Sequence, residues 1–209
     1  MNPEAGRPLK PPRPSTKREI TKTQNRGLIL DAARRVFAEL GYAAATVRDI
    51  IGATGLASGT FYNYFKSKEE VFQAIRDAAA LEVRPQLREA RMKAETGEDF
   101  IASAFRTFFE FLARVRTGEA GGGNPSALPR MRIDTPEVVV GFTELREDIE
   151  AATARGILPA TDAAYLAAAM IGVAFEMAEE MMTRSPPDID GATAFATRVF
   201  MGGLPSSRA

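Results

Sequence analysis

The segment TVRDIIGATGLASGTFYNYFK contains two short helical patterns separated by a glycine turn. Thr46 stands at an N-cap position, and Asp49 three residues later completes a pattern like a capping box. Gly55 ends the first pattern, and Phe61 and Phe65 share one face of the next helix at positions i and i+4. Two short helices joined by such a turn form a helix-turn-helix. This motif restricts the possible folds more than any other part of the chain.

The rest of the sequence also has helical periodicity, and no segment shows the alternation of a strand. Residues 25–40 form one helical pattern, and Ser67 caps a long helix in which Pro85 should cause a kink or a division near Val83. Further helices are predicted after Thr96, from Thr135 to about Arg155, from Thr161 to Met182 and from Asp190 to Phe200. The segment GEAGGGNPSALP is predicted to be a flexible loop. We therefore predict an all-α protein.

The chain lacks the two residue types that most often carry catalysis or bind transition metals. It has no histidine, which removes the commonest general base, and no cysteine, which excludes disulfides and thiolate metal sites. Carboxylate or lysine chemistry stays open. We expect that the protein is not an enzyme and that it has no catalytic residues, no metal site and no cofactor.

Charge is distributed unevenly along the 209 residues, although the net charge is zero. Residues 1–76 carry 13 Lys and Arg against 7 Asp and Glu, whereas residues 77–209 carry 14 against 20. A basic front is typical of a module that binds a polyanion. Residues 1–24 contain five of the 13 prolines and six basic residues. They are predicted to form a flexible basic arm, which either lies along DNA or is a solvated tail.

The sequence gives no indication of a membrane location. No apolar run approaches the roughly 20 residues that a membrane helix requires, and no apolar stretch of a signal peptide follows the basic start. With 45% hydrophobic residues the chain can fill a core. We expect a soluble, cytoplasmic protein.

The segment ILDAARRVFAELGYAAATVRDIIGATGLASGTFYNYFKSKEEVFQAI combines several short motifs in a fixed order. These are Phe-x-x-x-Gly-Tyr, Thr-Val-Arg-Asp-Ile, Gly-Thr-Phe-Tyr and Tyr-Phe-x-Ser-Lys-Glu. Together they closely resemble the DNA-binding domain of the TetR family of bacterial transcriptional regulators, over about a quarter of the chain. The resemblance implies an N-terminal three-helix helix-turn-helix DNA-binding domain at residues 25–70. It also implies a C-terminal helical ligand-binding and dimerisation domain at residues 71–209.

The second helix of a helix-turn-helix lies in the major groove, where its first side chains reach base edges while flanking groups hold phosphates. By resemblance, this recognition helix covers residues 57–62. Arg48 is a candidate for a bidentate guanine contact, or else a surface arginine that pairs locally. Lys68 begins a helix, whose N-terminus favours a phosphate. The predicted DNA-binding residues are Thr46, Arg48, Ser58, Gly59, Thr60, Tyr62, Asn63, Tyr64, Lys66 and Lys68.

The aromatic residues of this segment are expected to divide between core and surface. Phe61 and Phe65 are predicted to be core, while Tyr62 and Tyr64 could pack their rings or send their hydroxyls to a phosphate. Two positions depart from the family pattern, because residue 58 is Ser where many relatives have Lys and residue 64 is Tyr where many have His. The operator preference of relatives therefore does not transfer to this chain.

The resemblance also implies a homodimer in which the last two long helices build a four-helix interface. Ala167, Ile171, Ala174 and Ala178 lie at helical spacing and would let two helices approach closely, or else form core within one chain. Aromatic and methionine side chains could line a pocket for a small-molecule effector, or could simply fill the core. The candidate ligand-binding residues are Phe105, Phe108, Phe109, Met170, Phe175 and Met177.

These features favour a homodimeric, sequence-specific regulator that binds a double-stranded DNA operator. The main hypothesis is a repressor released from a palindromic site by a small hydrophobic ligand. An alternative is a non-specific architectural DNA-binding protein, for which a basic arm and domain would suffice. A third is an all-α carrier or carboxylate enzyme, which would leave the helix-turn-helix pattern unexplained. No membrane partner is expected.

Overall fold

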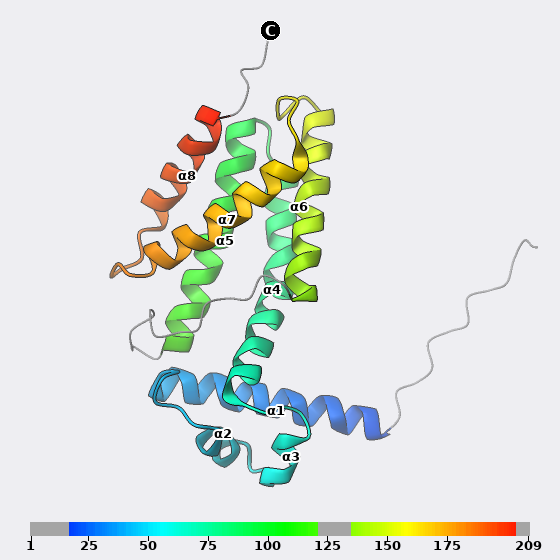
Figure 1. Cartoon of the computed structure of the whole chain (residues 1–209), viewed down its shortest axis with the longest axis vertical. Helices are drawn as coiled ribbons and strands as arrows, with labels where there is room; N and C mark the ends of the chain where they lie inside the picture. The colour runs from blue at the N-terminus through cyan, green and yellow to red at the C-terminus, as the bar shows by residue number, and fades with distance from the viewer. Residues whose placement is uncertain (1–16, 121–134, 204–209) are drawn as a thin grey trace, which may run out of the picture.

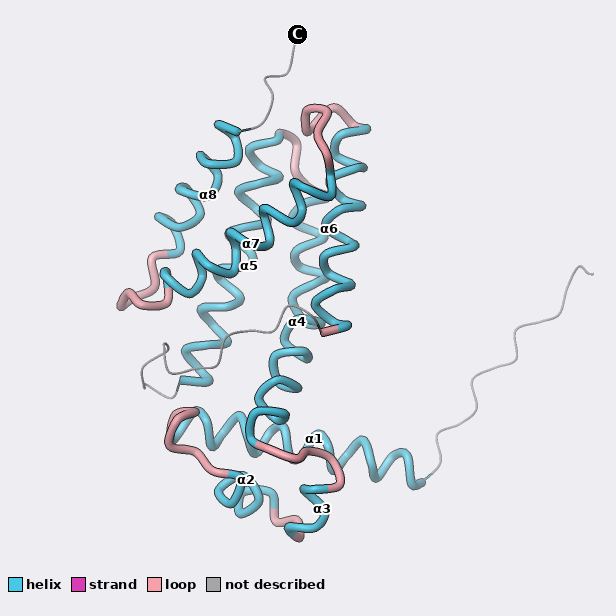
Figure 2. Tube along the Cα trace, in the orientation of Figure 1, coloured by secondary structure: helices cyan, strands magenta, loops and turns pink. Residues whose placement is uncertain are grey.

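The computed structural model describes residues 17–120 and 135–203, which form eight helices and no strand (Figure 1, Figure 2). The helices are α1 (Lys17–Leu40), α2 (Val47–Thr54), α3 (Ser58–Tyr62), α4 (Lys68–Met92), α5 (Gly97–Ala120), α6 (Pro136–Ala154), α7 (Ala163–Met181) and α8 (Ile189–Gly203). The prediction of an all-α protein is confirmed. None of the described helices is long and apolar enough to cross a membrane. The predicted glycine-rich loop lies outside the described residues, except that α5 continues through its first three positions.

α1 begins earlier than the sequence pattern indicates. Residues 17–24 are helical, so the prediction of a flexible arm is wrong for this stretch, while residues 1–16 lie outside the described residues. The stretch KREITKTQ has no proline or glycine, and the apolar pattern that follows supplies a nucleus from which the helix extends. Burial does not cause the extension, because Arg18 and Ile20 are exposed.

A first core holds α1, α2, α3 and the beginning of α4 together. Its aromatic rings pack edge to face or tilted, as in the pair Phe37 and Phe72, whose ring centroids are 5.7 Å apart. Phe61 is 1% exposed and Phe65 is 5% exposed. The core residues are Ile29, Leu30, Ala32, Ala33, Val36, Phe37, Tyr42, Ala45, Ile50, Phe61, Phe65, Val71, Phe72, Ala74 and Ile75.

α4 begins in this first group of helices and continues into the second group (Figure 1). It is one helix of 25 residues, so the prediction that Pro85 divides it is wrong. Proline removes one backbone hydrogen bond, but side chains on both sides of it are held in place. Val83 and Arg91 are each 5% exposed. One continuous element therefore joins the two groups of helices.

A second core lies among α4, α5, α6, α7 and α8. Its largest fully buried side chains include Phe100, Phe105, Phe109, Ile101 and Ile149. α5 packs against α4 on one side and against α8 on another, and α6 packs against α4 and α7. The cores are distinct sets of residues. α4 contributes to the first core and packs against α5 and α6 beside the second, and α1 also packs against α5.

The inward face of α7 is the one that the sequence offered as a dimer face. Ala167 and Ala178 are buried, and Ile171 and Ala174 pack against the second core of the same chain. The interpretation of this stripe as a contact between two chains is therefore wrong, and the alternative of core within one chain is correct. The opposite face of the helix is exposed: its first half has small residues and one tyrosine, namely Ala164, Tyr165, Ala168, Ala169 and Gly172, and its second half has Glu176 and Glu180.

Candidate functional site

The start of α2 is fixed by the predicted capping box. The backbone N–H of Asp49 donates to Thr46 Oγ1 at 3.3 Å, while the backbone N–H and hydroxyl of Thr46 donate to Asp49 Oδ2 at 2.9 and 2.6 Å. These hydrogen bonds hold the pKa of the Asp49 carboxyl below its ordinary value. The hydroxyl of Thr46 is thus engaged within the chain.

Arg48 follows the cap and is exposed to solvent. Its guanidinium has no hydrogen bond or ion pair with any residue that the structure describes. No ion pair in the described part of the chain therefore supports the alternative, in which Arg48 is a surface arginine that pairs locally. All five N–H donors of Arg48 are available to an external acceptor.

The turn and α3 present the other predicted residues. Gly55 has φ of 69°, in the left-handed region that favours glycine, and ends α2. In α3, Phe61 faces the core while the next side chain, Tyr62, is 57% exposed. Tyr64 is partly buried and packs against the first core, so its ring is held against the protein. The remaining predicted residues here are exposed at Ser58, Gly59 and Asn63 and partly buried at Thr60.

Lys68 was expected to be a free side chain that binds phosphate, but its ammonium has partners within the chain. Its Nζ donates to the carbonyl oxygens of Tyr42 and Ala45, at 2.9 and 3.0 Å, and lies 4.4 Å from the centroid of the Tyr42 ring. The ammonium therefore ties the start of α4 to the connection between α1 and α2. Lys66 remains exposed, with its backbone N–H bound to Glu70 Oε2 at 2.8 Å. A phosphate contact by either lysine stays a prediction.

Tyr42 completes this junction. Its hydroxyl donates to Glu69 Oε1 at 3.1 Å. Burial, reinforced by the hydrogen bond to the Glu69 carboxylate, raises the pKa of Tyr42 to about 12. The phenol therefore stays protonated at neutral pH and keeps donating. Sequence reasoning missed this role, since only the contacts of the folded chain bring Tyr42 to the start of α4.

The early part of α1 adds a basic stripe that the sequence pattern did not resolve. Arg18, Lys22 and Arg26 are exposed and lie at positions i, i+4 and i+8 of one helix. The Arg26 guanidinium carbon lies 5.4 Å from the centroid of the Phe65 ring, just after α3. The spacing was visible in the sequence, but it has meaning only if residues 17–24 are helical.

A cavity of about 140 Å³ lies between α4, α5, α6 and α7. Four of the six predicted ligand-binding residues line it, namely Phe105, Phe108, Met170 and Phe175. Phe109 does not line it, because this side chain is fully buried in the second core. Met177 does not line it either and packs against the same core.

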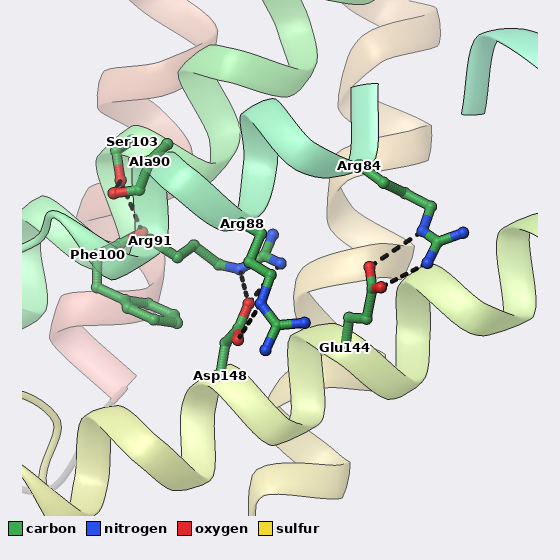
Figure 3. A network of polar contacts seen from close by, with 8 residues as sticks. All are labelled: Arg84, Arg88, Ala90, Arg91, Phe100, Ser103, Glu144 and Asp148. Atoms are coloured by element: carbon green, nitrogen blue, oxygen red, sulfur yellow. Dashed lines mark hydrogen bonds and ion pairs between the residues drawn. The ribbon is translucent and has the colours of Figure 1, made fainter. Parts of the chain in front are cut away.

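The cavity wall also includes charged residues that were not predicted. Arg76, Arg84 and Arg91 reach it from α4, and Glu137 from α6. Figure 3 shows how two of these arginines are linked to α6: Arg84 donates two hydrogen bonds to Glu144, and Arg91 donates two to Asp148. The sequence contained a signal for these cations. The three arginines are seven or eight positions apart along α4, so each lies about two helical turns from the next, on one side of the helix.

The sequence of residues 29–75 matches the model of a known family. The model of the bacterial regulatory proteins of the TetR family matches residues 29–75, which include α2, α3 and the residues of the first core. Residues 29–75 are therefore similar to the DNA-binding segment of the TetR family. The earlier resemblance is thereby confirmed for its DNA-binding segment.

The chain is also similar to a curated protein, an uncharacterized HTH-type transcriptional regulator of Haemophilus influenzae. The two are 30% identical over 96 residues, which is 46% of this chain. The chain spans about half of that relative, 47% of its length.

Solved structures extend the likeness of fold to most of the chain. A TetR-family transcriptional regulator from Pectobacterium atrosepticum has a TM-score of 0.67 at 20% identity, covering 93% of this chain and 100% of the other. RolR in complex with resorcinol has a TM-score of 0.67 at 18% identity, covering 90% of this chain and 91% of the other. At these identities the likeness shows a common fold.

Proposed function

We propose that the chain is a sequence-specific DNA-binding transcriptional regulator, and in the simplest form a repressor released from its operator by a small hydrophobic ligand. Residues 25–70 serve as the DNA-binding domain and residues 71–209 as the effector-binding and dimerisation domain. The observation that carries this proposal is the exposed, unpaired guanidinium of Arg48 beside the outward side chains of α3, on a helix-turn-helix fixed by its own caps. Such an arrangement provides both base-edge and phosphate contacts.

Replacing Arg48 with alanine should remove sequence discrimination while leaving general DNA affinity largely intact. A bidentate arginine–guanine contact contributes about 1–3 kcal/mol of discrimination, so we expect the ratio of specific to non-specific affinity to fall about 5- to 150-fold. Gel-shift titrations at one fixed salt concentration, with operator and random duplexes, measure this ratio.

Arg155→Ala is the matched control, because Arg155 is exposed at the end of α6, remote from the helix-turn-helix (Figure 1). It should leave both affinities unchanged. An equal weakening of both duplexes by Arg48→Ala would instead favour the architectural DNA-binding alternative.

The helices α7 and α8 pack against each other within the chain. We propose that dimerisation uses the faces of these two helices that point away from the core. Large apolar side chains remain exposed there: Tyr165 is 79% exposed, Phe195 55% and Val199 49%. Small residues on the outer face of α7 allow close approach of a second helix. Exposed large apolar side chains of this kind are typical of an interface.

Phe195→Glu should convert the dimer into a monomer of 22.6 kDa in multi-angle light scattering at micromolar concentration. A charge at the centre of an apolar interface must be desolvated without a partner. Val139→Glu is the control, since Val139 is 46% exposed on α6 and lies on another surface. If the Phe195 variant stays dimeric, the interface lies elsewhere.

We propose that the effector occupies the cavity beside α4. The cavity touches α4, and α4 also contributes to the first core, so a ligand that displaces α4 changes the position of α2 and α3. In a dimer the two recognition helices must lie about 34–36 Å apart to enter successive major grooves, and a shift of this spacing weakens binding. The resorcinol complex of RolR supports this view, because that protein has the same fold and holds a small molecule.

A further inference from the structure

The cavity wall combines an apolar surface with cations, and this combination defines what can bind there. Aromatic and aliphatic side chains form almost all of the surface, including Phe105, Phe108, Phe175 and Met170. Three arginines also reach the wall. Arginines in an effector site could attract a carboxylate, so the state of each guanidinium decides between a charged and an uncharged ligand.

The guanidinium of Arg84 is already paired with a carboxylate of the same chain. Its Nε donates to Glu144 Oε2 at 3.0 Å, and its Nη2 donates to the other carboxylate oxygen, so the pair is bidentate (Figure 3). The side chains of Arg84 and Glu144 are 25% and 19% exposed. Hydrogen bonding to Arg84 holds the pKa of Glu144 below its ordinary value, so the carboxylate stays ionised at neutral pH.

Arg91 is matched in the same way. Its Nε and Nη2 both donate to Asp148 Oδ2, at 2.9 and 2.7 Å, and the two side chains are 5% and 3% exposed. Arg88 adds a longer ion pair, with its Nε 3.7 Å from Asp148 Oδ1. A ligand carboxylate would have to displace Asp148 from a buried site to reach Arg91.

The remaining charged groups at the wall are Arg76 and Glu137. Arg76 is 4% exposed, and its guanidinium carbon lies 4.8 Å from the centroid of the Phe72 ring, toward the first core. Glu137 contributes a negative charge and has no ion pair with any described residue. An anion placed in the cavity would therefore meet the Glu137 carboxylate, two arginines that already have carboxylate partners, and Arg76, whose guanidinium lies against the Phe72 ring.

We propose that this cavity selects uncharged, apolar molecules of about the size of one aromatic ring, and that Glu144 and Asp148 exclude their anionic counterparts by saturating Arg84 and Arg91. This inference rests on the proposed function, because it defines the effector of that regulator. The size follows from the volume of about 140 Å³. An apolar cavity of about 150 Å³ holds one benzene molecule.

The test compares toluene with benzoate, which have similar shapes but differ in charge at pH 7. Isothermal titration calorimetry of the full chain should give an affinity for toluene at least about tenfold higher than for benzoate, because the buried carboxylate finds no free partner.

Glu144→Gln reverses the selection by releasing Arg84. Benzoate affinity should rise about tenfold or more, while toluene affinity changes less than about threefold. Toluene binding by this variant also verifies that the cavity is intact. In the double variant Arg84→Met/Glu144→Gln, the gain in benzoate affinity should disappear. Glu147→Gln, at an exposed position on the same helix, is the control and should behave like the parent chain.

Equal affinity of the parent chain for the two probes, or no binding of toluene, would overturn the inference. So would a Glu144→Gln variant that binds toluene but gains no affinity for benzoate. These titrations contain no DNA, so they test the cavity alone. Whether toluene releases operator DNA is measured separately by gel shift, and a failure there would count against effector control while leaving the binding preference in place.

Discussion

Replacing Asp148 with alanine should lower the free energy of unfolding by about 3–5 kcal/mol, because it leaves the buried guanidinium of Arg91 without its carboxylate partner. Asp148 accepts two hydrogen bonds from Arg91, and both side chains are at most 5% exposed. Arg88 cannot compensate, since it is a second cation. Urea unfolding followed by circular dichroism, at one fixed protein concentration, measures the loss.

Two further variants separate the buried charge from a general effect of mutation on α6. Glu150→Ala breaks an exposed ion pair with Arg146 and should cost about 1 kcal/mol or less. The double variant Arg91→Leu/Asp148→Leu replaces both charges with apolar groups and should regain most of the stability. A double variant as unstable as Asp148→Ala would show that packing, and not an unpaired charge, is responsible.

Phe61→Ala should destabilise the base of the molecule by about 3–5 kcal/mol and abolish operator binding. The ring is 1% exposed and contacts Phe65, with 6.2 Å between the ring centroids. Removing it leaves a cavity under α3, which has only five residues and depends on this packing. Hydrogen exchange should show lost protection in α1, α2 and α3 while α5 to α8 remain protected.

Tyr62→Ala is the neighbouring control. Its ring is 57% exposed and packs edge to face on Phe61, so its loss should cost about 1 kcal/mol or less. DNA affinity should fall although the fold is retained. If Phe61→Ala left protection of α1 to α3 unchanged, the assignment of this side chain as the anchor of α3 would be wrong.

The helix-turn-helix could largely be predicted because the sequence patterns that define it involve residues close together in the chain. The Thr46 capping box, the left-handed Gly55 and the pairing of Phe61 with Phe65 each depend on residues within four positions of one another. The start of α1 was missed because exposed residues with good helix propensity give no apolar pattern. Lys68 was assigned from its place at a helix start, yet its ammonium is held by carbonyl groups 23 and 26 positions away.

The rear of the molecule was predictable in its helices but only partly in its cavity. A phenylalanine stripe identifies a buried face, but the sequence does not say which rings border empty space, and so Phe105 lines the cavity while Phe109 does not. The stripe of α7 that suggested a dimer contact lies in the core, because alanine suits a core and a helix–helix interface equally well. The pairing of Arg84 with Glu144 joins residues 60 positions apart, which periodicity cannot reveal.

DNase footprinting on the DNA upstream of the chain's own gene tests the proposed regulator most directly. We predict a protected palindrome whose half-sites lie about one helical turn apart, with affinity that falls steeply as salt concentration rises. Weak binding of equal strength on all sequences, with no protected site, would contradict the proposed function.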